Sequence, residues 1–286
     1  MKRKFLVTGG TGFLGSHLVK RLLREGHKVR VLDNDSRGRK RRLAEEMNQI
    51  EMVVGDIREQ DIVVQAAKGC QSIIHMAYIN GTEFFYTKPE LVLEVGIKGM
   101  LNVLDACKFQ KVPELILISS SEVYQTPPTI PTPEDVPLVI PDIQNPRYSY
   151  GGGKAISELL AINYARKNLD RLVIVRPHNV FGPDMGWEHV IPQFIVRAYN
   201  QIQNNPQNPL VFSIQGQGNE TRAFVGVQDF TDGLMLAIEK GGHQEVYNIG
   251  TDEEITIANV AKIIVKVLGR EIDLRPGPLT SGSTLR

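Results

Sequence analysis

The sequence predicts an α/β protein, a doubly wound parallel sheet followed by a smaller C-terminal lobe. Short apolar runs recur through the first 176 residues, as in strands that are buried on both faces. Amphipathic helical segments alternate with these runs, which is the pattern of a parallel sheet covered by helices. After Pro177 the loops lengthen and a polar tract appears at 201–209, so the remainder is expected to form a separate lobe.

The predicted elements follow from periodicity. Short apolar runs predict strands over 5–8, 28–33, 51–54, 72–75, 114–119 and 171–176. Helical spacing of apolar residues predicts helices over 15–25, 89–108 and 154–167. We therefore assign residues 1–176 to the first domain and 177–286 mainly to the lobe. Helices are also expected near 229–240 and 257–269, the former packing back on the first domain.

Composition excludes several classes of protein. The 286 residues have a net charge of +1, which provides no basic field for nucleic acid or a membrane surface. Cys70 and Cys107 are the only cysteines, too few for a disulfide framework and typical of a reducing compartment. No apolar stretch approaches the length of a membrane span, and the six histidines lack metal-ligand spacing. We expect a cytoplasmic protein with no nucleic-acid or membrane partner and no metal.

A glycine-rich turn separates the first strand from the first helix. Gly9, Gly12 and Gly15 have the spacing G-x-x-G-x-x-G, which permits a tight turn and close approach to a pyrophosphate at the helix N-terminus. Asp33 ends the next strand, where a carboxylate binds ribose hydroxyls and repels a 2′-phosphate. The turn therefore predicts a Rossmann-type dinucleotide-binding domain that prefers NAD, with NADP as the alternative because Arg37 is near.

The order of motifs resembles a known family. TGGTGFLG (8–15), LDNDSRG (32–38), GDI (55–57), HMA (75–77), ISSSEVY (118–124) and YGGGK (150–154) resemble the extended short-chain dehydrogenase/reductases. More narrowly, the chain resembles their NAD-dependent nucleotide-sugar epimerase/dehydratase group, and RPHNVFGP (176–183), TRAF (221–224) and VYNIG (246–250) extend the match. The resemblance implies a Rossmann domain that holds NAD, a lobe that holds a nucleotide sugar, above all a UDP-sugar, and a homodimer.

The resemblance also assigns binding residues, motif by motif. To the cofactor it assigns Gly9, Gly12, Phe13, Leu14, Gly15, Asp33, Asn34, Ser36, Arg37, Gly38, Asp56, Ile57, Met76, Ala77, Tyr78, Tyr150, Lys154 and Pro177. To the substrate it assigns Ser120, Asn179, Val190 and Arg222.

Tyr150 and Lys154 are four residues apart, so on a helix they share one face. A free tyrosine is a poor base at neutral pH, but a nearby ammonium favours the phenolate. The resemblance implies that Tyr150 takes a proton from a sugar hydroxyl during hydride transfer, while Lys154 also holds the nicotinamide ribose. By the same resemblance Ser120 is the catalytic serine.

Ser121 and Glu122 bear on the reaction. Dehydratases of the group have Asp-Glu at this place, so the absence of the aspartate counts against 4,6-dehydration. The Ser-Glu pair resembles the decarboxylases that act on UDP-glucuronate. We expect an NAD-dependent nucleotide-sugar 4-epimerase that works through a transient 4-keto sugar. The alternatives are a UDP-glucuronate decarboxylase or 4,6-dehydratase and, from another class, a non-catalytic NAD-binding sensor. Ser121 and Glu122 join the predicted catalytic residues.

Two positions depart from the family pattern. Gly96 stands where an asparagine is common, so water or another side chain must replace its amide. Tyr78 replaces a small residue after Ala77 and is expected to narrow the sugar pocket. The glycines at 151–153 raise a further question, because each costs about 1 kcal/mol in a helix relative to alanine. On this stretch alone a flexible loop is favoured. Because the register places Tyr150 and Lys154 one turn apart, we interpret the glycines as part of the helix, where their smallness lets substrate, cofactor or a neighbouring helix approach.

Overall fold

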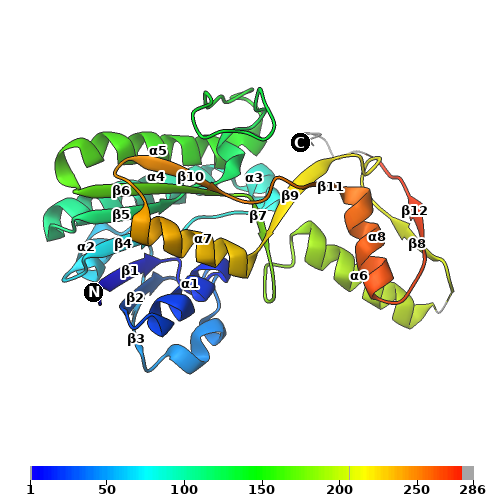
Figure 1. The fold of residues 1–286 in the computed structure, drawn as a ribbon, viewed down its shortest axis with the longest axis horizontal. Coiled ribbons are helices and arrows are strands. Elements are labelled where there is room, and N and C mark those ends of the chain that lie inside the picture. The colour runs from blue at the N-terminus through cyan, green and yellow to red at the C-terminus, as the bar shows by residue number, and fades with distance from the viewer. Residues whose placement is uncertain (1, 206, 279–286) are drawn as a thin grey trace. The chain divides into compact units, whose positions relative to one another are not determined.

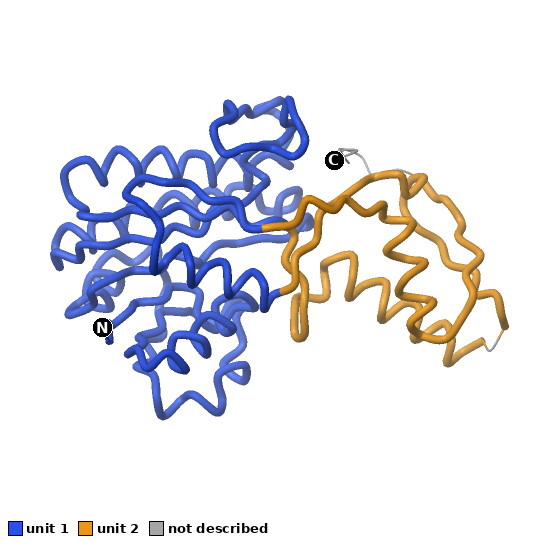
Figure 2. Tube along the Cα trace, viewed as in Figure 1, with its two compact units in different colours: residues 1–178, 227–249 blue, residues 179–226, 250–286 orange. Residues whose placement is uncertain are grey.

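The structure is a computed structural model that describes residues 2–205 and 207–278 (Figure 1). The chain forms two compact units, shown in different colours in Figure 2. Unit 1 comprises residues 1–178 and 227–249, and unit 2 comprises residues 179–226 and 250–286. The chain thus leaves unit 1 after His178, returns to it at Val227 and leaves it again after Ile249.

Unit 1 is built on a seven-stranded parallel sheet with the strand order β10–β6–β5–β4–β1–β2–β3. The strands are β1 (Lys4–Thr8), β2 (Lys28–Asp33), β3 (Ile50–Val54), β4 (Ser72–His75), β5 (Glu114–Ile118), β6 (Arg171–Pro177) and β10 (Glu245–Ile249). The predicted doubly wound α/β fold is confirmed. The strand order reverses between β1 and β4, and ligands of such sheets bind beyond the carboxyl ends of the strands at this point.

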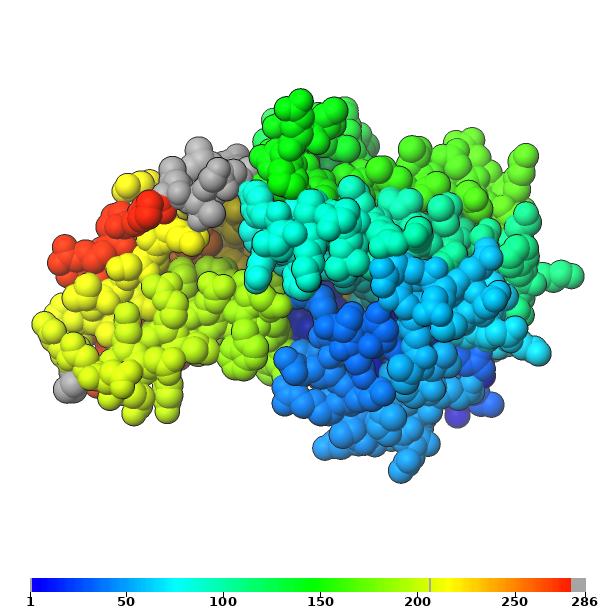
Figure 3. Space-filling view, turned by 180° about the vertical axis from the view of Figure 1, so that it is seen from behind, coloured from blue at the N-terminus to red at the C-terminus, as the bar shows by residue number. Residues whose placement is uncertain are grey.

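Helices cover both faces of the sheet (Figure 1). One face holds α2 (Gln60–Ala67), α4 (Pro89–Gln110) and α5 (Ser149–Asn168), and the other holds α1 (Phe13–Arg24) and α7 (Val227–Lys240). Short helical segments are α3 (Thr82–Thr87) and the 3₁₀ segments η1 (Lys40–Glu46), η2 (Ser121–Val123) and η3 (Pro146–Tyr148). On the surface of unit 1, the region of α3 lies beside that of η3 (Figure 3).

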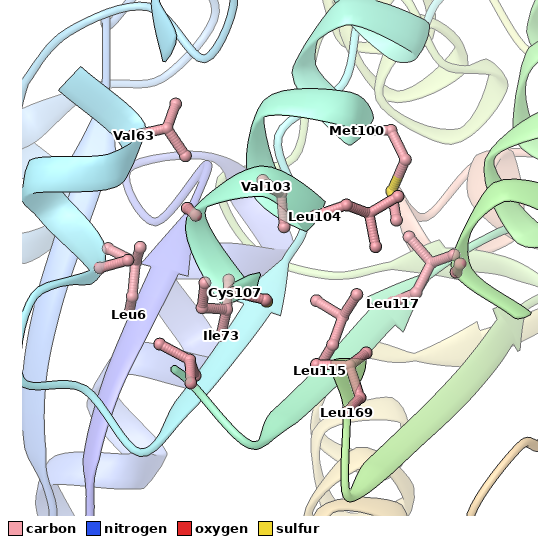
Figure 4. Close-up of a cluster of buried hydrophobic side chains, with 14 of the residues drawn as sticks. Leu6, Val63, Ile73, Met100, Val103, Leu104, Cys107, Leu115, Leu117 and Leu169 are labelled. Carbon is pink, nitrogen blue, oxygen red and sulfur yellow. The ribbon is translucent and has the colours of Figure 1, made fainter. Parts of the chain in front are cut away.

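A large apolar cluster joins the sheet to α2, α4 and α5 (Figure 4). Leu6, Ile73 and Leu115 extend from the strands towards Leu104 and Cys107 of α4, and all five are buried. Burial raises the pKa of the Cys107 thiol to about 12, so this cysteine serves as a core residue. Because the cluster anchors the strands rigidly, it also sets where their carboxyl ends lie.

Unit 2 has a core of its own. Its strands are β7 (Asn179–Phe181), β8 (Leu210–Ser213), β9 (Thr221–Gly226), β11 (Glu254–Thr256) and β12 (Ile272–Arg275), in the pairings β11–β9–β7 and β12–β8. Its helices α6 (Val190–Asn204) and α8 (Ile257–Val267) pack together over buried Phe194 and Phe212. α6 is not among the helices predicted from the sequence; its Pro192 lies in the first turn, where proline is tolerated.

Unit 1 also differs from the expected elements, since α2 and α3 lie outside the expected helix ranges. The helix expected from residue 154 begins at Ser149, so the three glycines lie inside α5 rather than in a loop. β10 pairs with β6 as an edge strand, although its residues were read only as a motif. No helix within residues 2–205 and 207–278 is long and apolar enough to cross a membrane.

Candidate active site

The turn after β1 can be built only from glycine at two of its positions. Gly9 has a φ of +74°, and a Cβ there would lie 2.8 Å from the Cα of Ala77. A Cβ on Gly15 would lie 2.1 Å from the carbonyl oxygen of Gly9. The turn is therefore packed against the end of β4 and against the start of α1, as close dinucleotide binding requires.

The N-terminus of α1 follows this turn. Its N-cap is Gly12, which offers no side chain to the first N–H groups, and Phe13 and Leu14 are the first helical residues. Unpaired N–H groups at a helix start favour an anion, here a pyrophosphate. The turn and the helix start therefore fit the phosphates of a dinucleotide.

Asp33 lies at the end of β2 beside the glycine turn. Its carboxylate accepts hydrogen bonds from the N–H groups of Thr11 and Asp35, both at 2.9 Å, and its side chain is almost buried. A Cβ on Gly38 would lie 1.9 Å from Thr11 Oγ1, so glycine is needed there too. The Arg37 guanidinium lies over the ring of Phe84 in α3, 4.8 Å from its centroid.

The loop after β3 holds the next predicted cofactor residues. Asp56 accepts hydrogen bonds from Arg58 Nη2 at 2.8 Å and from Asn34 Nδ2 at 3.0 Å. Hydrogen bonding to Arg58 holds the pKa of Asp56 below its usual range, against the effect of burial. The Ile57 carbonyl accepts a 2.8 Å hydrogen bond from Asn102 of α4. Ser36, in the loop after β2, donates its N–H to Asn34 at 3.0 Å.

Thr8 joins the ends of β1 and β4. Its Oγ1 accepts the N–H groups of Met76 and Ala77, both at 3.2 Å, and lies 2.8 Å from His75 Nδ1. With two bonds accepted, the hydroxyl proton goes to His75, which is therefore the Nε2-protonated tautomer. Burial lowers the pKa of His75 to about 3, so this residue is a neutral structural link. Pro177 ends β6, opposite Ile249 of β10.

Tyr150 is buried in the first turn of α5 between two aromatic rings. Phe85 stacks on it with centroids 5.1 Å apart, and Tyr78 meets it edge-on at 5.2 Å. Burial raises the pKa of Tyr150, a hydrogen bond with Ser120 opposes that rise and the charge of Glu122 adds to it. The Tyr150–Lys154 spacing predicts an ammonium that favours the phenolate, but in this structure the effect of burial on the pKa of Tyr150 dominates.

Lys154 lies one turn further along α5 and is only 4% exposed. Its Nζ donates a 2.7 Å hydrogen bond to the Ile118 carbonyl at the end of β5. The same Nζ lies 4.1 Å from the ring centroid of Tyr78 and 5.9 Å from that of Tyr150. Burial lowers the pKa of Lys154 to about 7, with Glu158 opposing the change. The ammonium therefore contacts Tyr78 more closely than it contacts Tyr150.

The buried lysine predicts a stability effect that depends on pH. An unfolded lysine keeps its proton up to about pH 10.5, so between pH 7 and 10.5 the unfolded chain binds more protons and stability rises with pH. A Lys154→Met variant removes this cost but leaves the Ile118 carbonyl unpaired, for a net gain of about 2 kcal/mol at pH 6. Urea unfolding at pH 6, 8 and 9.5 should show the gain shrinking; a difference that is independent of pH would contradict it.

The serines and Glu122 follow β5. Ser120 caps η2 by accepting the Glu122 N–H at 3.2 Å. It also lies near enough to Tyr150 to oppose the rise in the pKa of that residue. Ser121 and Glu122 form the first turn of η2 and are half-buried. Unit 1 therefore brings together the five predicted catalytic residues at the carboxyl end of β5.

The three glycines of α5 face three different neighbours. A Cβ on Gly151 would lie 2.0 Å from Gln125 Nε2 and 2.5 Å from the Glu122 carbonyl oxygen. A Cβ on Gly152 would lie 3.1 Å from Ile140 Cδ1, and one on Gly153 only 2.3 Å from Tyr78 Oη. Protein neighbours thus account for the smallness of Gly151 and Gly153, whereas Gly152 meets only a flexible side chain.

Alanine substitution should change the stability of the protein in opposite directions at Gly151 and Gly152. Gly151→Ala pushes against backbone and should destabilise the protein by about 2 kcal/mol. Gly152→Ala meets only the flexible end of Ile140 and should gain up to about 1 kcal/mol from helix propensity. Thermal unfolding of the two variants tests this, and equal effects would show that local packing does not decide the requirement for glycine.

The predicted substrate residues of the lobe lie in unit 2. Asn179 starts β7, and its Nδ2 donates a 3.2 Å hydrogen bond to the carbonyl of Ala223 in β9. Arg222, also in β9, donates to the carbonyl of Thr221 at 2.7 Å. Val190 starts α6 and packs against the core of unit 2.

Sequence reasoning missed two features of the site. Phe85 stacks on Tyr150, but nothing in its local sequence indicates this. Glu158 and Arg176 form a buried ion pair at 2.6 Å, and the position of Glu158 four residues after Lys154 was an available signal. Within the described parts of the chain, no group of three or more His, Cys, Asp or Glu side chains could hold a metal.

Comparisons with known proteins identify the family of the chain. The model of the NAD dependent epimerase/dehydratase family matches residues 5–250. UDP-N-acetyl-alpha-D-glucosaminuronate decarboxylase of Bacillus cytotoxicus is 31% identical over 92% of this chain and 80% of its own length. Several UDP-glucuronic acid decarboxylases are longer, and the chain spans 61% of one from Arabidopsis thaliana at 32% identity.

Solved structures of similar proteins include two with different reactions. The dTDP-glucose 4,6-dehydratase DesIV of Streptomyces venezuelae, with NAD bound, has a TM-score of 0.84 at 28% identity, covering 99% of this chain and 86% of that one. UDP-N-acetylglucosamine 4-epimerase of Methanobrevibacter ruminantium M1 has the same TM-score and identity, covering 99% and 88%. With a family match over most of its length and a turn that fits a dinucleotide, this chain belongs to the NAD-dependent epimerase/dehydratase family, whose members modify nucleotide sugars.

Proposed function

We propose that this chain is a nucleotide-sugar 4-epimerase that acts on a UDP-sugar through a transient 4-keto intermediate. The observation that supports it best is that η2, which Ser120 caps, packs against α5, which carries Tyr150, because epimerisation needs one proton-transfer group at one hydroxyl. Elimination of water would need a second acid, and Ser121 occupies the place where dehydratases of the resembled group have aspartate.

In the proposed reaction, Ser120 orients the C4 hydroxyl of the sugar and Tyr150 accepts its proton. NAD, when bound, would supply the chemistry for removing the C4 hydride and for its return to the other face of the sugar. Tyr150 then gives the proton back to the C4 oxygen, so that substrate and product have equal mass. Lys154, next to both rings, is proposed to hold the nicotinamide ribose, and Asn179, Val190 and Arg222 are proposed to bind the nucleotide sugar.

One observation favours a second candidate, decarboxylation of UDP-glucuronate. Glu122 lies close enough to Tyr150 to raise its pKa, so a carboxylate is available beside the oxidised sugar. The sequence Ser121-Glu122 also resembles the decarboxylases, and the similarity to named decarboxylases supports the idea. In this reaction the 4-keto acid would lose carbon dioxide, take up a proton at C5 and regain at C4 the hydride removed in the oxidation, which gives a pentose.

Incubation in D₂O separates the two reactions. We would supply UDP-glucose, UDP-N-acetylglucosamine, UDP-glucuronate and a dTDP- or GDP-sugar, and identify products by NMR and mass. Epimerisation by hydride return gives an isomer without deuterium on C4. Decarboxylation gives a pentose with one deuterium at C5, and this product would refute the epimerase. A panel without any product would favour the NAD-binding sensor.

A matched variant strengthens this test. Glu122→Gln should keep epimerase turnover, because the proposed epimerase uses Tyr150 alone for proton transfer. The same variant should abolish decarboxylation if Glu122 assists it. Loss of isomer formation in Glu122→Gln would mean that the carboxylate has a role that the epimerase proposal does not contain.

We also propose a cytoplasmic homodimer that associates through α4 and α5. Leu159 and Ile156 of α5 and Phe109 of α4 are exposed apolar side chains, with Leu159 63% exposed. Leu159→Glu should convert a dimer to monomers in sedimentation, because a charge would be buried in the interface. Val267→Glu, at an exposed apolar position of α8 in unit 2, is the control that should leave the dimer intact.

A further inference from the structure

Tyr78, in the loop after β4, contacts both predicted catalytic residues of α5. Its ring centroid lies 4.1 Å from Lys154 Nζ and 5.2 Å from the ring centroid of Tyr150, with the two rings nearly perpendicular. We propose that Tyr78 is a positioning residue for Lys154: its ring face holds the buried ammonium in place and keeps it charged. The proposal goes beyond the proposed reaction and does not depend on which sugar is bound.

The position of Tyr78 is set by two glycines on neighbouring helices. A Cβ on Gly96 of α4 would lie 2.2 Å from Tyr78 Oη, and a Cβ on Gly153 of α5 would lie 2.3 Å from it. The Tyr78 hydroxyl is buried between these two glycines and makes no hydrogen bond within the described residues. Steric fit alone therefore fixes the hydroxyl end of Tyr78. The ring face is the part of the side chain that contacts Lys154.

The surroundings of Lys154 explain why a ring face matters there. The ionisable groups that face it are Tyr78 from the loop, Tyr150 and Glu158 from α5, and His75 from β4. His75 is neutral, and Glu158 is already paired with Arg176 at 2.6 Å.

The Ile118 carbonyl is the one hydrogen-bond acceptor recorded for Nζ among the described residues. An aromatic face carries negative charge density and stabilises a desolvated cation that lies within about 6 Å. Tyr78 is thus well placed to oppose the effect of burial on the ammonium.

The direct test is an NMR titration of Lys154 in the NAD-free enzyme with ¹³C-labelled lysine. The Lys154 signal is assigned as the one that Lys154→Met lacks. Tyr78→Phe keeps the ring and should titrate like the wild type. Tyr78→Leu removes the ring and should lower the pKa of Lys154 by about one pH unit. A Tyr78→Leu protein in which Lys154 titrates as in the wild type would overturn the proposal, and no substrate is needed to see it.

A second set of variants tests the steric fit of Tyr78 between Gly96 and Gly153 without removing the ring. Gly153→Ala should displace Tyr78, lower the pKa of Lys154 and weaken NAD binding measured by calorimetry. Tyr78→Phe should rescue Gly153→Ala, because after loss of Oη the nearest Tyr78 atom to the new Cβ is Cζ at 3.6 Å.

Tyr78→Phe should not rescue Gly96→Ala, where Cζ at 2.4 Å and Cε2 at 2.7 Å still clash. Rescue of both double variants, or of neither, would contradict the claim that Gly96 and Gly153 set the position of Tyr78. A normal Lys154 titration in Gly153→Ala would contradict it as well. These outcomes differ from failure of the proposed function, which would appear only as missing sugar products.

Discussion

Tyr150→Phe is expected to lower turnover of the nucleotide sugar by about 10³-fold or more, because the reaction loses its proton-transfer group. The variant should fold normally, since phenylalanine keeps the stacking on Phe85 and the edge contact with Tyr78. NAD binding measured by calorimetry should be nearly unchanged. Turnover measured by NMR of the sugar products, beside NAD affinity, separates a chemical role from a structural one.

Tyr148→Phe is the matched control for this experiment. Tyr148 lies two residues earlier, in η3, and has glycine rather than lysine four positions later. Loss of the Tyr148 hydroxyl should leave turnover within about twofold of the wild type, because this half-buried tyrosine has no lysine one turn later. Full activity in Tyr150→Phe would mean that another group moves the proton and that the proposed mechanism is wrong.

Arg176→Met is expected to destabilise the protein by about 3 to 5 kcal/mol, because it leaves the Glu158 carboxylate buried without its partner. The two side chains are 5% and 3% exposed and lie 2.6 Å apart. Arg176 also donates to the Tyr124 hydroxyl at 2.7 Å and to the Glu134 carbonyl at 3.0 Å, so the loop after η2 should loosen as well. Urea unfolding followed by circular dichroism measures the effect.

The double variant Arg176→Met/Glu158→Leu should recover most of this loss, because it removes both charges together. Lys98→Ala, which breaks an exposed pair with Glu94 on α4, is the surface control and should change stability little. If the double variant is as unstable as Arg176→Met, packing and the loop contacts, rather than the unpaired charge, explain the loss.

Several features of unit 1 follow from local sequence. Apolar runs and helical spacing predict six of the seven strands and most of the helices, because strand and helix periods are local properties. The glycine turn could also be predicted, because the spacing of its glycines is a local signal. The positive φ of Gly9 explains why glycine is needed there. The spacing of Tyr150 and Lys154 places them one turn apart on any helix.

Other features depend on segments that are far apart in the chain. β10 joins the sheet beside β6 after unit 2 has intervened, and no local period indicates that partner. The helix through glycines 151–153 could be predicted from the Tyr150–Lys154 spacing, although propensity alone favours a loop. Their neighbours Gln125, Ile140 and Tyr78 could not be predicted, because they come from other segments.

The protonation states were also beyond local reasoning. Sequence spacing suggested that the Lys154 ammonium acts on Tyr150, but burial raises the pKa of Tyr150 and Lys154 lies against Tyr78. Spacing thus identified which residues meet on α5, since helix geometry is local. Only the tertiary structure decided the burial and charge of Tyr150 and Lys154 and their contact with Tyr78, because these depend on how β4, α4 and α5 pack together.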